Sequence, residues 1–150
     1  MPNTDSPERI SANRFATALA TRLSAAVPSP IRVVVENLAP ADADPDHNVI
    51  VRVLDSVELW SGQGISDSRL EPDEGDRLLE VAGYAAVTIL NGVQDSISRI
   101  LREPWPRLSS GAMAIPAART DDQHLYLWFG PSEFDAAITL EPITLAELAP

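Results

Sequence analysis

The chain has 150 residues, a net charge of −11 and 45% hydrophobic residues. A chain of this length is expected to form one domain, and its hydrophobic share is ordinary for a globular protein and too high for a disordered one. It contains no Cys and no Lys, which excludes disulfides, thiolate nucleophiles, cysteine-ligated metals, P-loop lysines and Schiff-base lysines. We expect a single domain over residues 1–150, with residues 1–5 as a flexible tail.

The acidic composition also limits the classes of partner. Nucleic acids and anionic membranes are bound largely through basic side chains, so both are disfavoured for a chain with 22 acidic and 11 basic residues. No apolar run approaches the ~18 residues needed to cross a bilayer. The amino terminus lacks the basic and apolar regions of a secretory signal. We therefore expect a cytoplasmic protein that binds other proteins.

The amino-terminal part of the chain predicts a helix followed by a strand. Ser6-Pro7-Glu8 has the composition of a helix start, and apolar residues at helical spacing follow it. Pro28 and Pro30 end this helix. Residues 31–38 are rich in β-branched side chains, which predicts a strand, and residues 39–48 predict an acidic, proline-containing loop.

The middle of the chain predicts further strand structure and then a long helix. Residues 49–60 alternate as a strand does, with an interruption at Asp55-Ser56 that is either a bulge or a tight turn between two short strands. Residues 61–64 predict a turn. An apolar stripe predicts an amphipathic helix from about Asp73 to Arg102, about 45 Å long. Because this exceeds the width of a compact domain of this size, we expect a bend at Asn91-Gly92.

The carboxyl-terminal part predicts a hairpin and one more strand. Residues 112–119 and 123–130 have strand character and are separated by a polar turn at residues 120–122. Pro116 indicates that the first of these strands lies at a sheet edge or carries a bulge. Residues 134–141 predict a further strand.

Thr144 and Glu147 have the spacing of a capping box, which predicts a terminal helical turn. The whole order of elements predicts an α+β fold: a mainly antiparallel sheet of about five to six strands, packed by the long amphipathic helix and by the N-terminal helix. This element order and the acidity resemble small acidic secretion chaperones, which pair a sheet with helices and dimerise. The resemblance implies a chaperone-like dimer and assigns no residue roles.

One acidic cluster has some features of a metal site. Asp42, Asp44, Asp46 and His47 place oxygen and nitrogen ligands at short spacing, and the alternate acids resemble the start of a calcium loop. The sixth position is His47 instead of Gly, and the twelfth is Val53 instead of Glu. We regard these four residues as weak metal candidates, assign no cofactor, and favour a solvated turn.

Catalytic signatures are sparse. The chain has two histidines, His47 and His124, and the sequence around Ser66 lacks the second glycine of a nucleophile elbow. We assign no catalytic residue. The alternative interpretation is a small-molecule or divalent-metal-binding domain, or a hydrolase, that uses His124 or the Asp42–His47 loop.

The hairpin carries the strongest functional signal. Its aliphatic face is expected to pack against the long helix, and its other face is amphipathic and aromatic, a composition enriched where proteins meet. The aliphatic face carries Ala114, Ala118, Leu125, Leu127 and Phe129. The candidate partner-binding residues on the other face are Met113, Ile115, His124, Tyr126 and Trp128. We expect an adaptor-like or chaperone-like interaction module, with homodimerisation as one form; the alternative is that a second helix, such as the amino-terminal one, covers this face.

Overall fold

The computed structural model describes residues 9–41, 43, 48–57, 59–72 and 77–150. The expected tail and the metal candidates Asp42, Asp44, Asp46 and His47 lie outside the described residues. The first helix begins at Ala12, with Ser11 as its N-cap, and not at Ser6-Pro7-Glu8 as expected.

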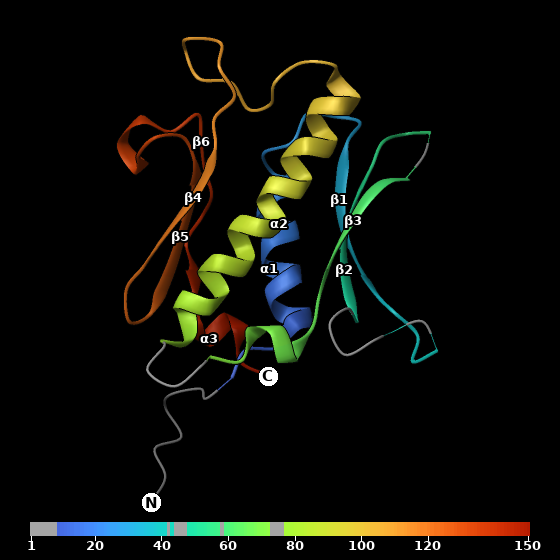
Figure 1. The fold of residues 1–150 in the computed structure, drawn as a ribbon, viewed down its shortest axis with the longest axis vertical. Helices are drawn as coiled ribbons and strands as arrows, with labels where there is room; N and C mark the ends of the chain where they lie inside the picture. Colours follow the sequence, from blue (N-terminus) through green and yellow to red (C-terminus); the bar gives the residue numbers. More distant parts are fainter. Residues whose placement is uncertain (1–8, 42, 44–47, 58, 73–76) are drawn as a thin grey trace, which may run out of the picture.

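The described strands form two antiparallel sheets with the two long helices between them (Figure 1). The first sheet has the order β1-β2-β3, and the second has the order β4-β5-β6, with β7 also paired to β5. The first sheet consists of β1 (Arg32–Asn37), β2 (Val49–Leu54) and β3 (Leu59–Ile65). The second consists of β4 (Pro116–Thr120), β5 (His124–Phe129), β6 (Ile138–Thr139) and β7 (Ile143–Thr144).

The α+β class is confirmed, but the strands are divided between two sheets where one sheet was expected. The helices are α1 (Ala12–Ser24), α2 (Leu78–Leu101) and the short α3 (Leu145–Leu148), and two 3₁₀ turns are η1 (Asp67–Leu70) and η2 (Glu133–Asp135). None of the helices in the described part of the chain combines the length and apolar content needed to span a membrane.

The hydrophobic core fills the space between the sheets. α1 packs on β1 and β2, whereas α2 contacts strands of both sheets. Because strand side chains alternate, each sheet turns one face to the helices and the other face outward. Most of the largest fully buried side chains come from α1, α2 and the second sheet: Phe15, Leu19, Leu23, Leu90, Ile97, Leu125, Leu127, Phe129 and Ile143.

α2 is one uninterrupted helix (Figure 1). Its 24 residues span about 36 Å, so it fits the domain without the bend expected at Asn91-Gly92. Gly92 instead permits close packing, because a Cβ at this position would overlap the side-chain amide of Gln63 on β3. The helix ends at Arg102, which adopts the left-handed conformation with φ of 58°.

The β2–β3 connection confirms the turn alternative at Asp55-Ser56, where the Val57 N–H donates to the Asp55 carboxylate at 2.8 Å. The turn predicted at residues 61–64 is wrong, since these residues belong to β3. The glycine at position 62 is consistent with a strand because the side chains of Ile50 and Arg52 on β2 lie over it.

The last part of the chain is partly as expected. Residues 134–141 do not form one long strand: only Ile138–Thr139 pair with β5, and η2 precedes them. The capping box is confirmed, since the Thr144 hydroxyl accepts from the Glu147 N–H at 3.2 Å and Glu147 accepts from the Thr144 N–H. These two bonds cap the start of α3.

Candidate protein-interaction site

The β4–β5 hairpin is present, but its register differs from the predicted one. A hairpin closed over residues 120–122 is expected to place Arg119 opposite His124, whereas the structure places Arg119 opposite Tyr126 and Ala117 opposite Trp128. The shift of two residues keeps every side chain on its predicted face, because strand side chains alternate with period two.

Asp121 explains the position of the turn. Its Oδ1 atom accepts backbone N–H groups of Gln123 at 2.8 Å and of His124 at 2.7 Å. The Asp121 N–H also donates to the His124 carbonyl at 3.0 Å. An aspartate that binds the backbone two and three residues later stabilises this kind of turn, and it moves the first strand pair out to Thr120 and Leu125.

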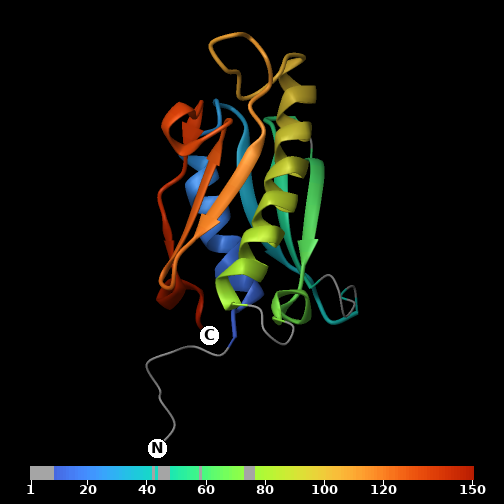
Figure 2. The same ribbon diagram turned by 60° about the vertical axis from the view of Figure 1, so that its left-hand side comes forward.

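The aliphatic face of the hairpin docks α2 as expected. Leu125, Leu127 and Phe129 are buried in the core. Gly83 of α2 lies against this face, so that a Cβ placed on it would be 3.5 Å from Leu125 and 3.8 Å from Ala118. α1 lies between the sheets, and in the described part of the chain no helix crosses the opposite face of the second sheet (Figure 2).

We call this opposite face, with Ile115, His124, Tyr126 and Trp128, the outer hairpin face. The strand expected over residues 112–119 begins only at Pro116, and Met113 lies before it in an isolated bridge to Arg107, so the structure does not place Met113 on the hairpin. Ile115 is 68% exposed and Met113 is 39% exposed, whereas His124 and Tyr126 are half-buried. Trp128 is only 8% exposed, and its indole N–H donates to the Gly130 carbonyl at 3.2 Å. Trp128 therefore has little surface to offer a partner, although it is not among the residues of the core cluster.

Phe134 is a functional candidate that sequence reasoning missed. Its side chain is 99% exposed, and it lies in η2, next to Glu133. Glu133 forms an ion pair with Arg119 of β4, which ties η2 to the outer hairpin face. Phe134 was expected to belong to a strand over residues 134–141, where its side chain would lie on one face of a sheet. Its exposure was therefore not predicted.

The outer hairpin face also carries a connected polar group around Tyr126. The Arg119 guanidinium lies over the Tyr126 ring, with its central carbon 4.0 Å from the ring centroid. The Tyr126 hydroxyl donates to Asp121 Oδ2 at 2.9 Å, and His124 Nδ1 lies 3.2 Å from Asp121 Oδ1. These contacts hold the tyrosine and histidine rings in fixed positions on the sheet.

Hydrogen bonds shift the ionisation of this group. Donation from the Gln123 backbone, from the Tyr126 hydroxyl and from His124 lowers the pKa of Asp121 to about 2. The bond to the Asp121 carboxylate raises the pKa of Tyr126 above its ordinary value. The ion pair with Glu133 raises the pKa of Arg119. The carboxylate is thus ionised, and the phenol protonated, at neutral pH.

The contacts of His124 do not form the hydrolytic site that the alternative interpretation requires. In the described part of the chain, the imidazole contacts Asp121 and the Tyr126 ring, and no hydroxyl nucleophile hydrogen-bonds to it. The described residues also contain no group of three or more acidic or histidine side chains that could hold a metal ion. The other half of that interpretation, the Asp42–His47 loop, lies largely outside the described residues.

No family model, curated protein or solved structure matches this chain.

Proposed function

We propose that this chain is a small, acidic, cytoplasmic protein-interaction module, adaptor-like or chaperone-like and without catalytic activity, that binds protein through the outer hairpin face together with Phe134. The observation that carries the proposal is the exposure of Ile115 (68%) and Phe134 (99%) beside a sheet face that no described helix covers.

The energetics favour an apolar contact at these two positions. Full burial of a large apolar side chain against a partner stabilises an association by about 1.5–3 kcal/mol. Aromatic and arginine side chains are also enriched at interfaces, and Tyr126 and Arg119 lie on the same face. Ile115 and Phe134 are thus the expected anchors, with the group around Tyr126 as a fixed polar neighbour.

The net charge of −11 supports a protein partner over nucleic acid or an anionic membrane, because both of these repel an acidic surface. The first partner that we propose is a second copy of the chain. Two outer hairpin faces related by a two-fold axis would bring the same apolar side chains together.

Light scattering after size-exclusion chromatography tests this. The wild-type chain is expected to have the mass of two copies, and the double variant Ile115→Ser/Phe134→Ser the mass of one. Val57→Ser is the matched control, because Val57 is 87% exposed and lies in the β2–β3 turn of the other sheet. A wild-type mass of one copy contradicts self-association, and a double variant that remains a dimer contradicts the assignment of the face.

A further inference from the structure

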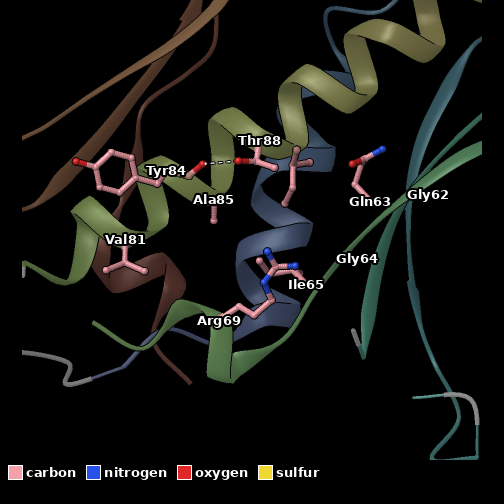
Figure 3. A pocket seen from close by; sticks show the side chains of 10 residues that line it. Gly62, Gln63, Gly64, Ile65, Arg69, Val81, Tyr84, Ala85 and Thr88 are labelled. Atoms are coloured by element: carbon pink, nitrogen blue, oxygen red, sulfur yellow. Dashed lines mark hydrogen bonds between the residues drawn. The ribbon is translucent and has the colours of Figure 1, made fainter. Parts of the chain in front are cut away.

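A crevice lies between β3 and the amino-terminal half of α2 (Figure 3). At one end Gln63 packs on Gly92 and holds the two elements together. From there α2 diverges from β3, and η1 closes the other end. The crevice has a volume of about 430 Å³ and is lined by Gly62, Gln63, Gly64, Ile65, Arg69, Val81, Tyr84, Ala85, Thr88 and Ile89.

The β3 side of the crevice is an unpaired strand edge. In an antiparallel ladder, alternate residues direct their N–H and C=O groups to opposite sides. The Ile65 carbonyl of β3 accepts from the Asn48 N–H, just before β2. The odd-numbered residues Gln63 and Ile65 therefore direct their backbone groups to β2, where they pair with Val51 and Val49.

The backbone groups of Gly62 and Gly64 are therefore directed away from β2, toward the free edge. β3 is the last strand of its sheet, and within the described residues no hydrogen bond reaches these two glycines from the edge side. Both glycines line the crevice and have no side chain that would keep a ligand away. The edge is thus open to a further strand.

The α2 side of the crevice is mainly apolar. Val81, Ala85 and Ile89 line the crevice from α2. Tyr84 is exposed, and its ring points away from β3 (Figure 3). Thr88 is satisfied within the helix, since its hydroxyl donates to the Tyr84 carbonyl at 3.1 Å. Apolar side chains of a bound segment would contact this wall.

Among the residues that the structure describes, Arg69 of η1 is the only charged one that lines the crevice. Its guanidinium forms neither a hydrogen bond nor an ion pair with any residue that the structure describes. The chain as a whole is strongly acidic, so an arginine without a partner at the closed end of this crevice favours a negatively charged group. A guanidinium binds a carboxylate through charge-assisted hydrogen bonds.

We propose that this crevice binds the carboxyl-terminal end of an extended peptide, which adds a strand to β3 and places its terminal carboxylate on Arg69. The addition of a peptide strand to a sheet edge uses main-chain hydrogen bonds for affinity and side-chain contacts for selection. Because η1 closes the crevice at Arg69, a chain that enters along β3 ends there, and it runs parallel to β3. This site lies on a different face from the outer hairpin face and does not depend on it.

The test uses a library of short synthetic peptides of random sequence, acetylated at the amino terminus and with a free carboxyl terminus. The companion library is identical but amidated at the carboxyl end. Immobilised wild-type protein is expected to retain peptides from the first library and not from the second. Equal retention of both libraries, or retention of neither, overturns the proposal.

The retained peptides are then titrated against variants. Arg69→Gln is expected to weaken binding by about tenfold or more, because a charge-assisted hydrogen bond is lost. Arg99→Gln is the matched control: Arg99 is another exposed arginine, at the carboxyl end of α2 and outside the crevice. Binding that is equally strong in Arg69→Gln and the wild type overturns the role of the carboxylate.

Amide hydrogen exchange locates the bound peptide. In the wild-type complex, exchange of the Gly62 and Gly64 N–H groups is expected to slow, because a strand added to β3 would hydrogen-bond to this edge. Protection confined to the β4–β5 hairpin would place the peptide on the outer hairpin face and overturn the crevice as its site.

Discussion

The guanidinium of Arg119 lies over the ring of Tyr126, with 4.0 Å between the guanidinium carbon and the ring centroid. The two residues are direct partners in the β4–β5 ladder, so this contact depends on the register of the hairpin. A cation over an aromatic ring stabilises by about 0.5–1 kcal/mol at an exposed site. The same tyrosine donates to Asp121 of the turn, which links the turn, the strands and η2 into one surface.

The titration of Tyr126 tests this linkage. The chain has two tyrosines, so in the variant Tyr84→Phe the tyrosinate absorbance comes from Tyr126 alone. We expect a midpoint above the ordinary pKa of 10.0, because the Asp121 carboxylate raises the pKa of Tyr126. Adding Asp121→Asn is expected to move the midpoint back toward 10.0. An unchanged midpoint in the double variant contradicts the Tyr126–Asp121 bond.

The sign of the effect on stability follows from the direction of the shift. Tyr126 has a raised pKa in the folded state, so its contribution is fully present below the unfolded-state pKa and is lost as the pH rises through the folded-state pKa. Urea unfolding of Tyr84→Phe across the alkaline range is expected to show this loss, and Tyr84→Phe/Asp121→Asn is expected to show less of it.

Asp121 gives the opposite dependence. Its pKa is lowered from 3.8 to about 2 by donors from Gln123, Tyr126 and His124. Its contribution is present above the unfolded-state pKa of 3.8 and is lost as the pH falls through about 2. A carbon-13 titration of the side-chain carboxyl should give a midpoint near 2. A midpoint near the ordinary 3.8 would show that the turn does not hold the carboxylate as described.

Two glycines of α2 form a matched pair for a test of packing. Gly83→Ala is expected to stabilise the protein by up to about 1 kcal/mol, since alanine favours helix and the nearest atoms lie at ordinary contact distances of 3.5–3.8 Å. Gly92→Ala is expected to gain less or to destabilise, because the new methyl group displaces Gln63. Denaturant unfolding measures both changes.

The control for this pair is Gln63→Ala. In that background, Gly92→Ala has room for the methyl group and is expected to recover the helix-propensity gain. If Gly92→Ala stabilises the wild type as much as Gly83→Ala does, the close contact between α2 and β3 is refuted.

Arg22 joins α1 to the carboxyl-terminal segment. Its guanidinium forms two bonds of 2.9 Å with the Glu147 carboxylate and donates to the carbonyls of Glu141 and Pro142. Its side chain is only 10% exposed, and its hydrogen bond lowers the pKa of Glu147. We expect Arg22→Met to lower the free energy of unfolding by about 2 kcal/mol, because several charge-assisted hydrogen bonds are lost.

Arg99→Met is the comparison for Arg22→Met. Arg99 forms an exposed ion pair with Asp95 on the same helix, and such pairs contribute about 0.5 kcal/mol or less. Equal losses for the two variants in urea unfolding would show that Arg22 does not clamp the carboxyl-terminal segment to α1.

Local patterns predicted the features that depend on local chemistry. The capping box at Thr144 and Glu147 needs only two side chains at a fixed spacing. The two faces of the hairpin were correct although the register was not, since alternation survives a shift of two residues. The missing information was the side chain of Asp121, whose bonds place the turn one residue further along the chain.

Features that depend on distant segments were not predictable in the same way. Whether strands join one sheet or two is decided by pairing between remote parts of the chain, and the helix layer between the sheets was therefore missed. Trp128 is buried although it lies on the outer side, beside β6. Gly62 belongs to a strand only because side chains of β2 cover it. Periodicity along one segment carries none of this information.

Site-directed photo-cross-linking tests the central claim most directly. A photoreactive amino acid placed at Phe134, which is 99% exposed, lies beside the outer hairpin face, and the same group placed at Val57 lies in the β2–β3 turn. On illumination in cells that produce the chain, the account predicts a cross-link to a second copy or to another protein from position 134 and none from position 57. Cross-linking that is absent from position 134, or equal at both positions, would contradict it.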